Sequence, residues 1–247
     1  MNIISRTLNQ WKGGVRLYIA IATLATTLEV WWWANASYSG TALYASRMAE
    51  IFAWLGLALI ATAVSIGPFY KVFSRVPGRR QWFEARRLLG VSGAWFATLH
   101  SLIAYGSEFN FANPTSLPSV YQRAFIAGGI ALIILLAMVA TSFDKAFTAM
   151  GIWWFRLHRF VYVALVAILG HAFAIGVHAT QHAVLLVLSL AAVWIVGLHI
   201  FRQKTRPTIW QLAGLTAMAI ALFTVFNYGY SKSQQNQSSG GSYAYAK

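Results

Sequence analysis

Two apolar stretches that each end in a histidine decide the fold: RRLLGVSGAWFATLH at residues 86–100 and RLHRFVYVALVAILGH at residues 156–171. Each stretch begins with arginine and continues with residues that are almost all apolar or small. Spanning a bilayer takes about 20 largely apolar residues. Both stretches are therefore predicted to be membrane-spanning helices that carry a histidine inside the membrane.

The whole chain has the composition of an integral membrane protein. Of its 247 residues, 58% are hydrophobic and 10% are charged, and the mean hydropathy is +0.58. A soluble domain of this size needs far more charge to cover its surface. Cysteine is absent, which excludes Cys-ligated iron–sulfur clusters, disulfides and covalently attached c-type haem. Any redox group must therefore be held by other ligands.

Seven apolar stretches are predicted to span the membrane, at residues 16–35, 47–70, 87–107, 121–142, 157–178, 182–201 and 208–229. Basic residues cluster before the first span, between the second and third, before the fifth and after the sixth, all on one side of the membrane. The positive-inside rule then places the N-terminus in the cytoplasm and the C-terminus outside. This pattern assigns the net charge of +14 to contact with anionic lipid headgroups and argues against nucleic acid as a partner.

The chain divides into three predicted parts. Residues 1–206 form the main transmembrane domain, with a core at about 47–200, and residues 207–229 add one more transmembrane helix. Residues 230–247 are a polar tail of Gln, Ser, Gly and Tyr on the outer side, whose composition predicts disorder.

Six histidines are the candidate ligands. His100 lies 13 residues into its span and His171 lies 12 residues into its own, so the two are at matching depths of roughly 20 Å and 18 Å. Ionisable or metal-binding residues inside apolar spans are costly and usually functional. Two facing imidazoles can ligate a haem iron, so His100 and His171 are the predicted axial pair; histidines that only form hydrogen bonds between helices are the alternative.

The remaining histidines have other predicted places. His158 sits at the inner membrane edge, where His199 has the depth to pair with it around a second haem. On an ideal helix His158 and His171 project about 140° apart, so a second haem stacked under the first would need a bulge or a rotated approach. His178 and His182 fall at the outer interface.

Several motifs together resemble the ferric reductase-like transmembrane family. Residues 86–90 with 97–100 look like the third helix of that family, and residues 156–162 followed by His171 are similar to its fifth. Ile66-Gly67-Pro68 and Ala140-Thr141-Ser142 also fit, and the resemblance covers roughly residues 47–200. It implies a six-helix core that binds b-type haem, here followed by a seventh transmembrane helix.

The resemblance also implies ligands and a function. Its helix-three and helix-five histidines correspond to His100 and His171, with His158 as a third candidate for the metal. Related oxidases carry two histidines on each helix, but Arg86 stands at the inner position of span 3. One haem is therefore expected and a second is left open. The implied function is electron transfer from quinol or a cytoplasmic flavin donor, through haem, to an outer-side acceptor, in a bacterial cytoplasmic membrane.

Other readings of the chain stay open. It is expected to be a subunit of an oxidoreductase system rather than a complete enzyme, and the alternative is an accessory haem-binding or structural subunit of a larger respiratory or photosynthetic complex. The candidates to bind haem propionates are Tyr105, Tyr121 and Arg123 at the outer end of the haem, and Arg86, Arg87, Arg156 and Arg159 on the inner side. The alternative for the inner arginines is that they only follow the positive-inside rule. Glu29 is expected to pair with Arg47, the alternative being a proton relay from quinol. Glycines near the histidines, Gly90, Gly93, Gly170 and Gly176, fit close approach of a flat macrocycle, and the alternative is helix packing, for which glycine is common in membrane helices.

Overall fold

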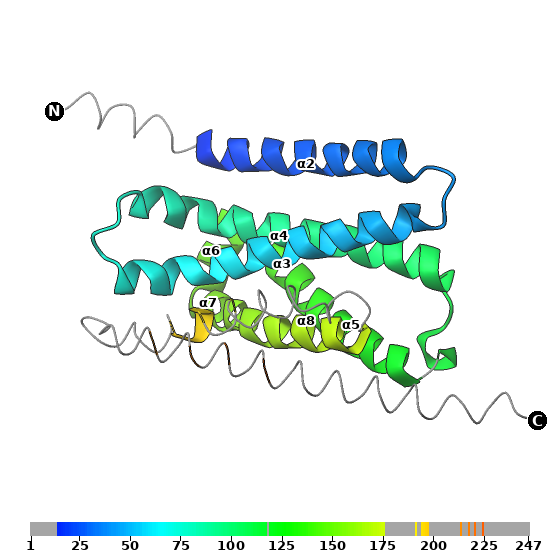
Figure 1. Cartoon of the computed structure of the whole chain (residues 1–247). Helices are drawn as coiled ribbons and strands as arrows, with labels where there is room; N and C mark the ends of the chain where they lie inside the picture. The colour runs from blue at the N-terminus through cyan, green and yellow to red at the C-terminus, as the bar shows by residue number, and fades with distance from the viewer. Residues whose placement is uncertain are drawn as a thin grey trace, which may run out of the picture. The chain divides into compact units, whose positions relative to one another are not determined.

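The computed structural model describes residues 14–117 and 119–175, together with residues 191, 194–197, 213, 217, 220 and 224. Two compact units divide the chain, Met1–Ala174 and Ile175–Lys247. The described part of the first unit consists of helices joined by short turns and contains no strand (Figure 1). The helices are α2 (Gly14–Tyr38), α3 (Leu43–Val72), α4 (Arg79–Phe109), the short 3-10 helix η1 (Pro114–Ser116), α5 (Ser119–Ala140), α6 (Asp144–Met150), α7 (Ile152–Arg159) and α8 (Val161–Ile175).

Five helical segments of the described part are long and apolar enough to cross a membrane. They are Gly14–Tyr38, Leu43–Val72, Arg79–Phe109, Tyr121–Ala140 and Ile152–Ala172. The first five predicted spans are thereby confirmed in number and order, and the protein is a multi-pass membrane protein. The sixth and seventh predicted spans lie outside the described residues, apart from a few positions.

α4 begins eight residues earlier than the predicted third span. It starts after Gly78, which has a φ of 84°, and its first turns carry the basic run at 79–87. Arg80 and Glu84 form an i,i+4 ion pair at 2.9 Å, a spacing that supports a helix on its exposed face. Hydropathy alone missed this amphipathic start because its charged residues belong to the membrane surface.

The α3–α4 pair forms the core of the described bundle, and the two helices run side by side (Figure 1). They cross closely at Gly56 and Gly93, where a Cβ on Gly93 would lie 2.6 Å from Ile60 Cγ1. Phe52 and Phe96 stack beside this crossing with ring centroids 5.7 Å apart, and both are almost fully buried. Gly93 therefore serves helix packing, and the interpretation that it clears room for a macrocycle is wrong.

α2 joins the pair through polar side chains within the membrane. The Thr23 and Ser92 hydroxyl oxygens lie 2.7 Å apart, and the Trp95 indole donates to Thr27 Oγ1 at 3.1 Å. Such bonds satisfy polar groups that hydrocarbon cannot.

The expected ion pair between Glu29 and Arg47 is not present. Arg47 instead pairs with Glu50, three residues along its own helix, with nitrogen and oxygen 2.8 Å apart. An i,i+3 partner is on the same helix face and needs no second helix to bring it within reach. Glu29 is exposed on α2.

The connection between α5 and α8 is helical, which the sequence interpretation did not anticipate. α6 and α7 are two short helices separated by Gly151, whose φ is 50°. The Trp154 indole donates to the Thr141 carbonyl at 2.9 Å and so fastens α7 to the end of α5. α7 ends at Arg159 and α8 begins at Val161, so the ideal-helix angle between His158 and His171 does not apply as calculated.

Candidate functional site

His100 and His171 make the same local contact on different helices. His100 is on α4, and its Nδ1 lies 2.9 Å from the Ala49 carbonyl oxygen of α3. His171 is on α8, and its Nδ1 lies 2.8 Å from the Ala124 carbonyl oxygen of α5. A carbonyl only accepts, so in a neutral imidazole Nδ1 carries the proton and Nε2 keeps its lone pair. Both histidines are thus in the tautomer that a metal ligand needs.

The two imidazole rings, from α4 and α8, lie close together and nearly perpendicular to each other. Their centroids are 5.9 Å apart and their planes meet at 81°. Two nitrogen–metal bonds of about 2 Å on opposite sides of an iron, plus about 1 Å from each nitrogen to its ring centre, give a separation of about 6 Å. The structure therefore brings together the two rings that matching depth predicted to be close, at a spacing that suits one axially ligated iron.

The donor set fits haem better than a bare metal ion. In the described part of the chain, no group of three or more His, Cys, Asp or Glu side chains could hold a metal ion. A macrocycle supplies four of its own nitrogens and asks the protein for only one or two axial ligands. Two facing histidines therefore suffice for haem, whereas most protein-bound metal ions need three or more protein ligands.

Gly128 of α5 makes room for His171. A Cβ built on Gly128 would lie 2.7 Å from His171 Nδ1 and 3.0 Å from its Cε1. Its neighbour Gly129 has open space in the same position, with no atom within 4 Å. The absence of a side chain at 128 therefore lets the ring lie against α5 and reach the Ala124 carbonyl.

Sequence reasoning missed Gly128 and the two carbonyls. The adjacent glycines at 128 and 129 in an apolar span were the available signal. The carbonyls of Ala49 and Ala124 left none, because every residue has one. Among the glycines that the sequence did single out, Gly90 and Gly170 have open space around them, and Gly176 lies outside the described residues.

His158 lies apart in α7, and its ring stacks on Trp154 with centroids 3.6 Å apart. Its Nδ1 is 3.0 Å from the Trp154 carbonyl oxygen. Its Nε2 is buried and has no hydrogen-bond partner within the described residues, so this nitrogen too keeps a lone pair available. Its expected partner His199, like His178 and His182, lies outside the part of the chain that the structure describes.

Four of the residues expected to bind haem propionates lie on α4 and α5. Arg86 reaches into the bundle, where its Nε donates to the Ala63 carbonyl of α3 at 2.9 Å. The Tyr105 hydroxyl donates to the Ala112 carbonyl at 2.6 Å. Arg123 is exposed on α5, one residue before Ala124, and Tyr121 is exposed two residues earlier. Arg123 and Tyr121 thus share a helix with the carbonyl that orients His171.

Comparison with known proteins points to one family. The family model described as "Ferric reductase like transmembrane component" matches residues 51–169. This segment belongs to the ferric reductase-like transmembrane family. It contains the whole of α4, α5, α6 and α7, with His100 on α4 and His158 on α7, and it ends two residues before His171.

Several curated proteins that are similar to this chain are named protein-methionine-sulfoxide reductase heme-binding subunit MsrQ. The protein from Rhizobium meliloti is 28% identical over 166 residues, which cover 67% of this chain and 72% of the relative. That from Pasteurella multocida is 28% identical, covering 54% and 65%. That from Cronobacter sakazakii is 42% identical, covering 35% and 43%. The comparison with solved structures found no significant match.

Proposed function

We propose that this chain is a membrane electron-transfer subunit that holds a b-type haem between His100 and His171. The observation that carries the proposal is the close pair of imidazoles, each with Nδ1 bonded to a carbonyl of a neighbouring helix. With the proton on Nδ1, each ring keeps the lone pair of Nε2, so the two histidines would together supply a bis-imidazole site. The heme-binding name shared by the similar MsrQ proteins supports the same cofactor.

The residues of the chain do three things for such a group. Ala49 and Ala124 fix the ring orientation and the tautomer of the two histidines. Their carbonyls also make the imidazoles more basic, which strengthens them as ligands. The apolar helices around the site keep water away, which influences the redox potential. The haem supplies one-electron chemistry when it is bound.

The proposed direction of electron flow is from the cytoplasmic side of the membrane to the outer side. With the N-terminus in the cytoplasm, His100 and His171 lie in the outer half of the membrane, closer to an outer-side acceptor than to a cytoplasmic donor. Quinol or a cytoplasmic flavin protein is the proposed donor, and an outer-side redox protein is the proposed acceptor. The reductase-subunit name of the similar proteins supports a partner protein of this kind.

Absorption spectra of the purified full chain test the proposal. We expect a Soret band, and sharp α and β bands after dithionite reduction, typical of low-spin bis-histidine haem. His100→Ala and His171→Ala should each abolish these bands. Thr98→Ala is a matched control, because among the described residues the only hydrogen-bond partner of the Thr98 side chain is the Ala94 carbonyl of its own helix. A full low-spin spectrum in both histidine variants would refute the pair, and a chain that binds no haem would leave the structural-subunit alternative.

A second haem at His158 remains a separate proposal. It is supported by the buried Nε2 of that residue, which lacks a partner within the described residues. Haem titration of the intact chain gives the count. A stoichiometry of two that falls to one in both His158→Ala and His199→Ala would establish it, and a wild-type stoichiometry of one would exclude it.

A further inference from the structure

A pocket of about 260 Å³ lies at the basic end of the bundle, remote from His100, which is 13 residues or about 20 Å further along α4 than Arg87 on its rim. It is bounded by α2, α4 and the residues that lead into α6. Its charged side chains are Arg16, Arg87 and Asp144, and its apolar wall is formed by Leu88, Val91 and Phe143. Three segments far apart in sequence thus combine a charged rim with a hydrophobic floor.

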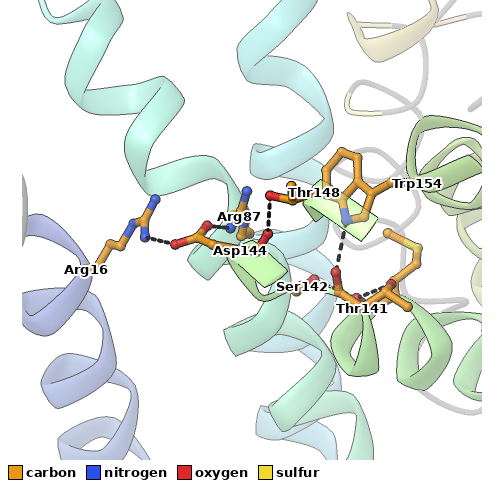
Figure 2. Close-up of polar contacts among 8 residues, drawn as sticks. Arg16, Arg87, Thr141, Ser142, Asp144, Thr148 and Trp154 are labelled. Carbon is orange, nitrogen blue, oxygen red and sulfur yellow. Dashed lines mark hydrogen bonds and ion pairs between the residues drawn. The ribbon is translucent and has the colours of Figure 1, made fainter. Parts of the chain in front are cut away.

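The charges at the rim leave an excess of one positive charge. Asp144 uses one carboxylate oxygen for Arg87 and the other for Arg16, whose nitrogen lies 3.6 Å away (Figure 2). Each guanidinium has five N–H donors, and each of these two contacts uses one nitrogen. The carboxylate is therefore occupied, whereas the arginines keep donors for a further anion. The side chains of Arg16 and Arg87 are 50% and 27% exposed, so an anion can reach them.

Helix length places this rim at the membrane boundary. α4 has 31 residues, which gives a length of about 46 Å against a hydrocarbon layer of about 30 Å. Arg87 lies eight residues, or about 12 Å, from the basic end of α4. That is close to the depth where headgroups meet hydrocarbon, and Leu88 and Val91 continue from there toward the membrane interior.

Neighbouring contacts hold Arg87 in place at the rim. Its guanidinium lies 5.8 Å from the ring centroids of both Phe147 and Trp154. Trp154 is fixed in turn by its bond to the Thr141 carbonyl, and Thr148 donates to the Asp144 backbone at 3.0 Å (Figure 2). Because aromatic rings and a carboxylate already restrict the Arg87 side chain, it loses less conformational entropy when an anion binds.

We propose that this pocket binds the phosphate of an anionic phospholipid, with Arg16 and Arg87 on the phosphate and one acyl chain along Leu88, Val91 and Phe143. The excess of one positive charge matches the single negative charge of phosphatidylglycerol. A zwitterionic lipid would need a free carboxylate for its ammonium group, and Asp144 is already paired with two arginines. The apolar wall favours a lipid over free inorganic phosphate.

Native mass spectrometry of the full chain in mild detergent tests this site by titration with phosphatidylglycerol, phosphatidylethanolamine and inorganic phosphate. Arg16→Gln removes one guanidinium and leaves the Arg87–Asp144 pair. We expect phosphatidylglycerol to bind it roughly fivefold more weakly, the effect of one basic residue at a membrane surface. The control is Arg75→Gln, which removes the same charge from the turn after α3, outside the pocket.

Three further results are expected besides the weaker binding to Arg16→Gln. Phosphatidylglycerol must bind wild type more tightly than phosphatidylethanolamine, Arg75→Gln must bind it like wild type, and millimolar phosphate must not displace it. Equal affinity for the two lipids, an equal loss in both variants, or unchanged binding in Arg16→Gln overturns the site. Displacement by inorganic phosphate overturns the lipid and leaves a simple anion site.

Discussion

Replacing Gly128 with alanine tests the histidine pair without touching a ligand. The new Cβ would lie 2.7 Å from His171 Nδ1, whereas ordinary contacts of this kind begin at about 3.5 Å. The ring must therefore shift by about 0.8 Å or α5 must move away from α8. A shift of the ring lengthens its 2.8 Å bond to the Ala124 carbonyl. Overpacking of this size costs about 1–3 kcal/mol.

The expected loss in haem binding follows from that displacement. Removing the hydrogen-bond partner of a ligating histidine typically weakens metal binding by about 10–100-fold. We expect Gly128→Ala to bind haem more weakly by a factor in this range. Part of the bound haem should become high-spin as the bond from His171 to iron lengthens. Titration of haem into apoprotein, followed at the Soret band, measures both effects.

Gly129→Ala is the matched control, because a Cβ there has no atom within 4 Å. It should bind haem like wild type and gain up to about 1 kcal/mol of helix stability. The reasoning is refuted if Gly128→Ala keeps wild-type affinity and a fully low-spin spectrum. It is also refuted if the two alanine variants lose haem equally, since the loss would then not come from contact with His171.

Two further predictions concern the scaffold. Phe96→Ala should lower the unfolding free energy by about 3–5 kcal/mol, because the ring is 2% exposed and stacks on Phe52. The loss is measured as a lower midpoint of unfolding in denaturant. An unchanged midpoint would contradict the place of Phe96 in the core. The hydrogen bond and charge of Arg87, with the charge of Arg16, hold the pKa of Asp144 below its usual 3.8. The ion pairs of Asp144 therefore stabilise the fold fully above that pH, and this stabilisation is lost only as the pH falls through the lowered pKa. The difference in thermal midpoint between wild type and Asp144→Asn should therefore be constant from about pH 8 to pH 5 and shrink only below 3.8, and shrinkage near neutrality would contradict it.

Hydropathy and depth in the membrane were enough to predict the membrane-spanning helices and the histidine pair from the sequence. Five spans and the proximity of His100 and His171 could be predicted because burial in hydrocarbon imposes a length and a depth on every apolar helix. The ion-pair partner of Arg47 could not be predicted in the same way. Glu29 and Glu50 were both candidates, and which of them lies within reach of Arg47 depends on the rotation of the helices. α6 and α7 were missed because their aromatic residues continue the apolar pattern of the span that follows them.

The ligand geometry of this bundle depends on a register shared by α3 and α4. Gly56 and Gly93 mark the closest crossing of the two helices, and Ala49 and His100 make the hydrogen bond beside it. Each bonded residue is seven positions from its glycine, and seven residues are close to two helical turns. Both pairs therefore lie on the same faces of the two antiparallel helices, and spacing set at the glycines extends to the histidine.

This register predicts that a change at the crossing reaches the haem site. A Cβ on Gly93 would lie 3.1 Å from the Gly56 carbonyl and the Ile60 backbone nitrogen, and backbone cannot move aside as a side chain can. Gly93→Ala should separate α3 from α4, lengthen the bond between Ala49 and His100, and weaken haem binding although residue 93 contacts no ligand. Thr98→Ala is the control on the same helix, because within the described residues the Thr98 hydroxyl bonds to the Ala94 carbonyl of α4 itself. If Gly93→Ala destabilises the fold and leaves haem affinity and spin state unchanged, then α4 positions His100 independently of α3.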